Sequence, residues 1–195
     1  MSVPLSHRKQ SRFEAQHHYY RLRSEVTTLM INDFGFSPEK YEKQIEHYRE
    51  AHKNVENVDA VVERMKAKSD SFQKWFIDKE CDAILEILRK IESEFTFGNS
   101  IYPSETPAKI DEYKERRAHI TAAIANCYIL KQELQYIIRT LPVDLNKYKR
   151  FATAIDEQIA LYKGVRQSDN RFLRTKNKKN KTSGERKSSS EAVKT

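Results

Sequence analysis

The most constraining feature of this sequence is a set of residues between 107 and 141 that recur alternately three and four positions apart. The set consists of Ile110, Tyr113, Arg117, Ile120, Ile124, Cys127, Lys131, Leu134, Ile138 and Leu141. This spacing places side chains on one side of an α-helix, and eight of the ten are apolar or aromatic. Pro107 suits the first turn of such a helix, and Pro142 stops it. We therefore expect a helix over residues 107–141 that packs along its length against partner helices.

Three further segments show the same helical spacing. A capping box, Ser11-Arg12-Phe13-Glu14, predicts a helix from residue 11 to about residue 33. A second helix is expected from about residue 58 to Phe95, ended by Gly98-Asn99, and a third over residues 144–163, ended by Gly164 as a C-cap. The apolar positions of these two are Ile77, Cys81, Ile84, Leu88, Ile91 and Phe95, and Leu145, Tyr148, Ala152, Ile155, Ile159 and Tyr162. Because no window alternates with the period of a strand, the sequence predicts an all-α fold, an antiparallel four-helix bundle.

Residues 37–70 add an extra helical element to this bundle. Ser37-Pro38 has the form of a helix start, with serine as the cap and proline at the first helical position. The short helix that follows should end near residue 52, and Asn54-Val55-Glu56-Asn57 separates it from the next one. We therefore predict a four-helix domain over residues 1–173 with an insertion at about 37–70, followed by a separate tail over residues 174–195.

The net charge of +8 is concentrated at the two ends of the chain. Residues 166–195 hold ten Lys or Arg against three Asp or Glu, and residues 1–25 hold five against two. The 140 residues between them therefore sum to −2. Beyond Phe172 the sequence has no aromatic residue and consists mainly of Lys, Asn, Ser, Thr and Glu. Such a segment cannot bury enough apolar surface to offset the entropy of ordering, so we expect a disordered basic tail.

The sequence offers no convincing catalytic, cofactor or metal site. Glu14 and His17 have the Glu-x-x-His spacing of di-iron bundles, but that architecture needs a second such pair, which the sequence lacks. Cys81 and Cys127 do not form a Cys-x-x-Cys motif and lie in register with apolar stripes, where a thiol acts as a small hydrophobe. Four scattered glycines cannot form a phosphate-binding loop. We expect a non-enzymatic protein without cofactor or metal.

The basic ends are the best candidates for a binding site. Clustered lysine and arginine neutralise phosphates and release counterions, so they bind nucleic acid without reading its sequence. The candidates in the tail include Arg171, Arg174, Lys176, Lys178, Lys179 and Lys181. The alternative is a tail that only solubilises the chain. Arg117 and Lys131 occupy stripe positions, and we expect their stems to pack while the charged groups reach solvent at the edge of the bundle.

Tyrosine is abundant, with ten residues in the chain. Five of them are candidate platforms on which unpaired bases could stack: Tyr19, Tyr20, Tyr128, Tyr136 and Tyr148. A buried tyrosine more often fills a core or an interface while its hydroxyl finds a polar partner. We favour the second role for these residues.

Three short motifs resemble one protein family. Ser2-Val3-Pro4, Ser6, Arg8 and Ser11-x-Phe13-Glu14 resemble the opening of the accessory variability determinant (Avd) proteins, which are accessory proteins of bacterial diversity-generating retroelements. Trp75-Phe76-Ile77-Asp78-Lys79, followed by Ala83-Ile84-Leu85, is similar to the start of their second bundle helix. Ser168-Asp169-Asn170-Arg171-Phe172 is similar to their closing segment. The resemblance covers residues 2–36 and 72–173.

This resemblance implies a homopentamer of four-helix bundles with a basic surface. Proteins of that type bind a reverse transcriptase and its template RNA, and thereby support error-prone cDNA synthesis. By this analogy Arg8, Lys9, Arg12, Arg171 and Arg174 are candidates for contact with RNA or with the polymerase.

Two functions remain as hypotheses. The first is an accessory protein that binds RNA, with DNA as a second possible polyanion, together with a reverse transcriptase. The second is a structural, oligomeric helical bundle that binds only protein. No stretch of 18 apolar residues or secretory leader is present, so we expect a cytoplasmic chain without membrane contact.

Overall fold

The computed structural model describes residues 12–102 and 109–191, with the backbone alone for residue 109 and residues 170–191. Within these ranges the chain is all-helical. The elements are α1 (Arg12–Ile31), the short 3₁₀ helix η2 (Asp33–Gly35), α2 (Pro38–Ala51), α3 (Val58–Ser100), α4 (Lys109–Thr140) and α5 (Leu145–Glu191). The predicted all-α class is therefore confirmed.

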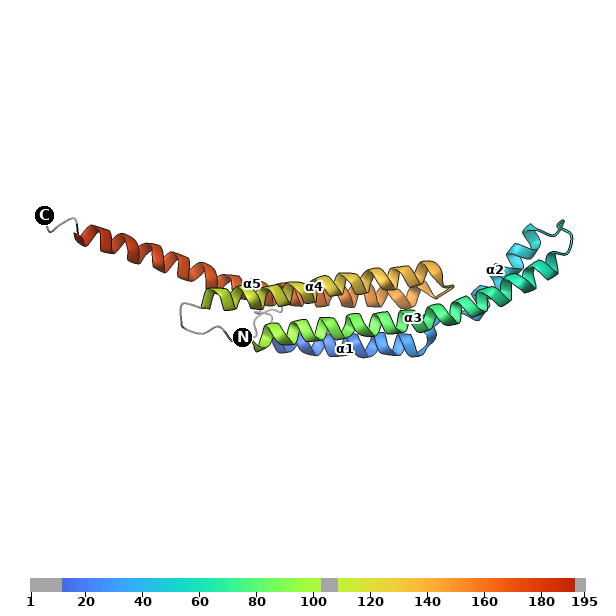
Figure 1. Cartoon of the computed structure of the whole chain (residues 1–195), viewed down its shortest axis with the longest axis horizontal. Coiled ribbons are helices and arrows are strands. Elements are labelled where there is room, and N and C mark those ends of the chain that lie inside the picture. Colours follow the sequence, from blue (N-terminus) through green and yellow to red (C-terminus); the bar gives the residue numbers. More distant parts are fainter. Residues whose placement is uncertain (1–11, 103–108, 192–195) are drawn as a thin grey trace, which may run out of the picture.

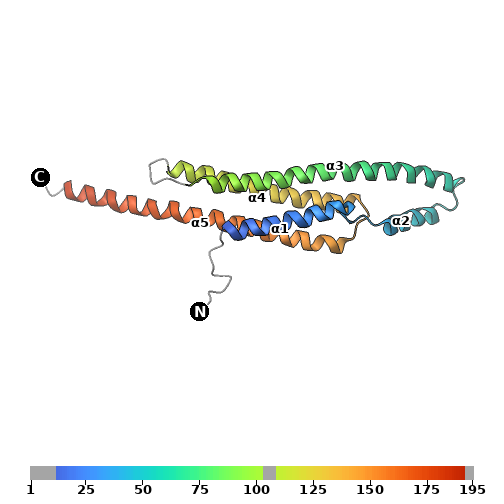
Figure 2. The ribbon, with the colours of Figure 1, turned by 90° about the horizontal axis from the view of Figure 1, so that it is seen from below.

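Four of these helices pack around one hydrophobic core. α1 contacts α3 and α5, and α4 also contacts both α3 and α5, so that the four lie side by side (Figures 1 and 2). We call this unit the body. Its core holds Leu22, Ile84, Leu88, Ile120, Leu130, Ile137, Phe151, Ile155 and Tyr162, each nearly or fully buried.

The stripe of α4 lies one residue away from its predicted register at three positions. Tyr113, Ile120, Cys127 and Leu134 are buried as expected, but Arg116, Leu130 and Ile137 are buried in place of Arg117, Lys131 and Ile138. The reason is that a helix accommodates either three or four residues between successive contacts, so two neighbours compete for each position. Buried residues recur three and four apart at 113, 116, 120, 123, 127, 130, 134, 137 and 141; Ile124 is buried beside them, as predicted, whereas Ile110 of the predicted stripe is exposed.

Two predicted helix ends are wrong. α3 continues through Gly98 to Ser100, and Gly98 is buried inside it. α5 continues through Gly164, because Val165 and Asp169 extend its buried stripe beyond Tyr162. The helix also crosses residue 174, where the sequence predicted a disordered tail, and its backbone is helical to Glu191. The boundary between the domain and the tail stays a prediction.

The end of the body at which α1 stops is closed by a compact turn. Phe34 is fully buried and has a positive φ of 55°, and Gly35 follows at 70°. The hydroxyl of Tyr148 donates a hydrogen bond to the Phe34 carbonyl over 2.7 Å. Phe36 forms a single antiparallel bridge with Val143 of the connection between α4 and α5.

The extra segment begins as predicted. The backbone N–H of Lys40 donates to the Ser37 hydroxyl, and Pro38 occupies the first turn of α2. A loop over residues 52–57 then separates α2 from α3, also as predicted. α2 and the first part of α3 project beyond the body (Figure 1).

Candidate nucleic-acid interface

A buried ion pair fixes α5 at the end of the body opposite to η2. The Arg116 side chain is fully buried in α4, and its Nε lies 2.8 Å from Oδ2 of Asp169 in α5. The same guanidinium donates to the carbonyl of Ile101 over 3.1 Å and to Oδ1 of Asn99 over 3.4 Å. One cation thus joins α4, α5 and the end of α3. We call this end of the body the Arg116 pole.

The start of α1 lies at the same pole. The Arg12 guanidinium is 5.8 Å from the centre of the Tyr102 ring, a cation–π contact between α1 and the segment after α3. Tyr113 is buried nearby, and burial raises the pKa of its hydroxyl. The Asp169 carboxylate raises that pKa further, while Arg116 and Arg12 lower it. Asp169, Arg116 and Arg12 therefore all influence the pKa of Tyr113.

The predicted nucleic-acid-binding residues can now be placed relative to the Arg116 pole. Arg12 is exposed at the first described residue of α1, and Arg8 and Lys9 lie outside the described residues. Arg171 stands two positions after Asp169 on α5, and the other predicted cations follow it on the same helix: Arg174, Lys176, Lys178, Lys179 and Lys181. This part of α5 runs past the other helices (Figures 1 and 2). The structure therefore brings the start of α1 and the exit of α5 to one pole.

The cations expected at the edge of the bundle behave differently from one another. Arg117 is exposed and lies outside the buried stripe in which it was predicted, and the neighbouring Arg116 takes the interior position. Nζ of Lys131 lies 2.7 Å from Oδ2 of Asp156, and its side chain keeps 29% of its exposure. The role of Arg116 was missed because nothing local in the sequence shows that Asp169 will meet it across 53 positions.

The five tyrosines divide into two groups. Tyr19 and Tyr148 lie in the core, where burial raises the pKa of each hydroxyl and each donates to a backbone carbonyl. The predicted core role is confirmed for these two. Tyr20, Tyr128 and Tyr136 are about half exposed, and Tyr128 accepts a hydrogen bond from Nζ of Lys163 over 3.0 Å.

The candidate chemistry of the thiols and histidines is limited. Cys127 is fully buried, and burial raises the pKa of its thiol to about 12. Cys81 is half buried, and burial also raises its pKa, with Asp78 adding to the effect. His17 is exposed and stacks on Phe13 with the ring centres 6.5 Å apart. In the part of the chain that the structure describes, no group of three or more His, Cys, Asp or Glu could hold a metal ion.

Among the described helices, none combines the length and apolar character needed to cross a bilayer. Comparisons of the chain with models of protein families, with curated proteins and with solved structures each find no match.

Proposed function

We propose that this chain is a non-enzymatic accessory protein that binds nucleic acid, in the first place the template RNA, and a reverse transcriptase. In this proposal it supports mutagenic cDNA synthesis in a diversity-generating retroelement, within the cytoplasm. The observation that supports the nucleic-acid part is that Arg12, at the start of α1, and the exit of α5, whose sequence carries the other basic end, lie at the Arg116 pole. The reverse transcriptase and the retroelement are proposed on the resemblance to Avd proteins.

The physical argument rests on where the charge lies. The middle 140 residues carry a net charge of −2, so a polyanion gains little from the body. Arg12 lies at the same pole as the part of α5 that begins at Arg171, and in this proposal the charges of the two basic ends add within one region. Each phosphate that they neutralise releases condensed counterions, which is favourable at low salt and independent of base sequence.

We further propose that the body acts as an antiparallel four-helix bundle and that residues 174–195 form a tail that is disordered without its ligand. Flexible cations can follow the backbone of a single strand and order on it when it binds. The resemblance also suggests a homo-oligomer, a pentamer, which would display several such poles on one assembly and raise the apparent affinity.

The direct test is RNA binding as a function of salt. One variant replaces Arg171, Arg174, Lys176, Lys178, Lys179 and Lys181 with glutamine. The expected result is a large loss of affinity for a single-stranded RNA at low salt, because phosphate contacts are lost. The log–log salt dependence should also flatten, by about 0.7 for each lost phosphate contact. Fluorescence anisotropy over a series of salt concentrations measures both quantities.

A matched control separates position from total charge. It replaces six exposed cations away from the pole with glutamine: Lys43, Lys53, Lys74, Arg89, Arg139 and Lys149. Each set of six lowers the formal net charge of +8 to +2. Equal weakening by both sets would show that only net charge matters and would contradict a defined site. Unchanged binding by the first variant at every salt concentration would refute the role of α5.

The second candidate function is that of a helical oligomer that binds only protein. The exposed surface of α4 supports it. The exposed surface of α4 between Ala118 and Gln135 carries uncharged residues, among them Tyr128 and Ile129, in a chain that is 33% charged. A face of this kind suits helix–helix association. Sedimentation analysis of Ile129→Glu against the unaltered chain tests it, and assembly that persists at high salt without RNA binding would support this second function over the first.

A further inference from the structure

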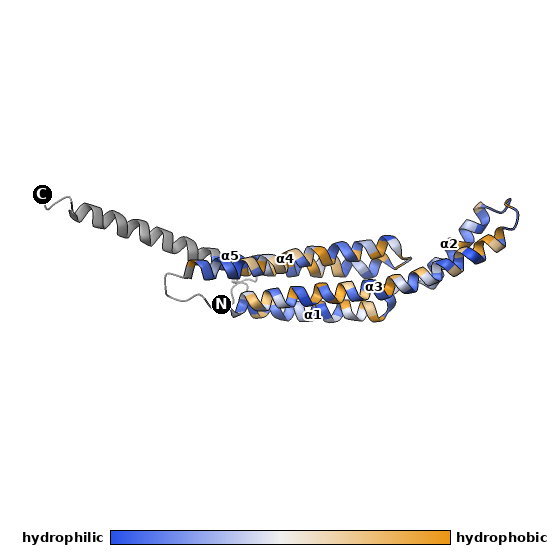
Figure 3. Cartoon of the chain, viewed as in Figure 1, coloured by the Kyte–Doolittle hydropathy of each residue, from blue (hydrophilic) through white to orange (hydrophobic). Residues whose placement is uncertain are grey.

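The segment that projects beyond the body has few contacts of its own. We call it the arm, formed by α2 and residues 58–75 of α3. α2 buries no side chain, and its contacts with other helices are mainly with α3. Apolar positions nevertheless recur along it (Figure 3). Neither the nucleic-acid proposal nor the resemblance gives this arm a role.

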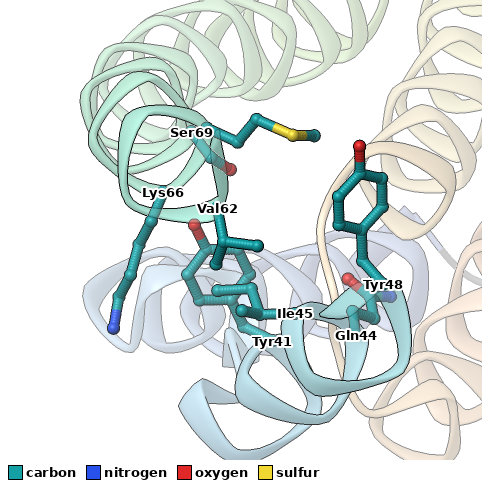
Figure 4. Close-up of a pocket in the computed structure, with 8 residues that line it drawn as sticks. Tyr41, Gln44, Ile45, Tyr48, Val62, Lys66 and Ser69 are labelled. Atoms are coloured by element: carbon teal, nitrogen blue, oxygen red, sulfur yellow. The ribbon is translucent and has the colours of Figure 1, made fainter. Parts of the chain in front are cut away.

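A cavity of about 210 Å³ lies between the two helices of the arm. It is lined by Tyr41, Gln44, Ile45 and Tyr48 from α2 and by Val62, Met65, Lys66 and Ser69 from α3. In the close-up, the Tyr48 ring stands at one side of the open space and Val62 at another (Figure 4). An apolar cavity of about 150 Å³ already holds a benzene ring, so this one has room for a large apolar side chain.

An exposed apolar stripe continues from this cavity along α3. It consists of Val61, Met65, Phe72 and Trp75, which are 41, 48, 47 and 56% exposed. Steps of four, seven and three residues keep these positions on one face of the helix. Met65 belongs to both the cavity and the stripe. The ring centres of Phe72 and Trp75 lie 5.8 Å apart, so the stripe ends in an aromatic cluster.

Two lysines stand in the same stripe. Lys68 falls between Met65 and Phe72, and Lys79 follows Trp75 by one turn. Both are exposed, and within the described residues neither forms an ion pair. This contrasts with Lys66, which lies 3.4 Å from Glu42 of α2, and with Arg49, which lies 3.0 Å from Asp59. Lys68 and, one turn beyond the arm, Lys79 thus add exposed positive charge to the line of the stripe.

We infer that the stripe and the cavity of the arm bind an acidic amphipathic helix of a partner protein. From Val61 to Trp75 the stripe is about 21 Å long, which matches about four turns of a helix laid against it. One apolar side chain of the partner fills the cavity, others cover Phe72 and Trp75, and carboxylates meet Lys68 and Lys79. This is helix-in-groove recognition, in which apolar anchors give affinity and charge gives specificity.

Other occupants fit less well. A helix that lies on a membrane keeps its lysines on the polar face, whereas Lys68 stands in the centre of this apolar stripe. A second copy paired through the same stripe would bring lysine against lysine. Single-stranded RNA could stack on Trp75, but it has no side chain for a cavity lined by Ile45, Val62 and Met65.

The single tryptophan of the chain makes the site directly observable. The probes are three 18-residue helical peptides without tryptophan that share one leucine face and carry glutamate, glutamine or lysine beside it. With the full chain, the glutamate peptide should move the Trp75 emission to shorter wavelength in a saturable manner. It should bind at least about tenfold more tightly than the glutamine peptide, and the lysine peptide should not bind.

Three double substitutions test which residues bind the glutamate peptide. Lys68→Glu with Lys79→Glu should weaken binding of the glutamate peptide at least about tenfold. Lys43→Glu with Lys74→Glu, an equal change of charge at exposed positions outside the stripe, should leave it unchanged. Met65→Ala with Phe72→Ala should abolish the emission shift while the circular dichroism spectrum stays helical, because both residues are about half exposed and lie outside the body's core.

Several outcomes would overturn the inference. They are no emission shift with the glutamate peptide, equal affinity for all three peptides, or the same loss of affinity in both charge variants. An emission shift produced instead by phosphatidylcholine–phosphatidylserine vesicles, by oligouridine or by self-association would assign the stripe to that occupant. RNA bound at the Arg116 pole leaves Trp75 unaffected, so failure here is distinct from failure of the nucleic-acid proposal.

Discussion

At the scale of single residues, the most informative finding is a buried arginine, because the other cations whose side chains the structure describes lie mostly at the surface. Arg116 has no exposed surface, and the Asp169 side chain keeps only 4%. Such a pair contributes little net stability, because both ions lose their hydration. The pair instead fixes how the helices are arranged, because the Arg116 guanidinium finds its partners only where Asp169 of α5 and Ile101 at the end of α3 lie beside it.

Removal of one partner should therefore be costly. Asp169→Asn leaves the guanidinium buried without a counter-ion, and the free energy of unfolding should fall by about 3–5 kcal/mol. Urea denaturation followed by circular dichroism measures the change. As a control, Asp111→Asn removes the exposed partner of Lys114 and should change stability little. If both substitutions have equal effects, the Arg116 pair does not hold the pole together.

The thiol of Cys127 should make stability depend on alkaline pH. Burial raises the pKa of this group from 9.0 to about 12, so the folded chain keeps the proton over a range where the unfolded chain loses it. Stability therefore falls as pH rises from 9 towards 12, by about 1.4 kcal/mol per pH unit from this group. Cys127→Ala should lower stability at neutral pH and make the decline above pH 9 shallower, in denaturation experiments at several pH values. An identical slope in both proteins would contradict the effect of burial.

At the scale of elements, α3 and α4 approach each other closely because α3 contains a glycine at the contact. A Cβ atom on Gly98 would lie 3.2 Å from the Arg116 carbonyl oxygen, 3.2 Å from Cγ1 of Ile120 and 3.3 Å from Cβ of His119. The sequence suggested that this glycine ends the helix. It instead lies inside α3, and what it provides is space for the neighbouring backbone.

Two glycine substitutions should consequently have opposite signs. Gly98→Ala forces the backbone of α4 to move, and we expect destabilisation by about 1–3 kcal/mol in spite of the better helix propensity of alanine. Gly164→Ala, within α5 and only partly buried, should stabilise the chain by about 0.5–1 kcal/mol. Thermal denaturation of the two variants tests this, and stabilisation by both would show that Gly98 is not needed for the contact.

At the scale of the whole molecule, the two proposed binding regions lie at opposite ends. The Arg116 pole holds the start of α1 and the exit of α5, and the arm projects from the other end (Figure 1). This separation would allow one chain to hold a polyanion and a protein helix at the same time without competition. The arm and the body also differ in how much surface they bury.

That difference should be visible in hydrogen exchange. Backbone amides of α2 should exchange many times faster than those of residues 120–137 in α4, because α2 buries no side chain whereas α4 is central to the core. Mass spectrometry of peptides from both regions measures the ratio. Equal protection would show that the arm opens only when the whole body unfolds, which would contradict an independent arm.

The sequence by itself determined the helices, because apolar spacing is a local property that each helix carries in full. It also located the cap at Ser37, the break at residues 54–57 and the concentration of positive charge at both ends. It could not determine which of two neighbouring residues turns inward, as with Arg116 and Arg117, since both satisfy the same spacing.

Only the tertiary structure decided the points that depend on meetings between distant segments. Asp169 pairs with Arg116, Gln158 donates to the carbonyl of Ala15 over 3.0 Å, and Gly98 admits the backbone of α4. Each is a polar or steric contact between two groups that meet only when the helices pack. The approach of the start of α1 to the exit of α5 and the cavity in the arm arise in the same way, because proximity in space is set by packing and not by order along the chain.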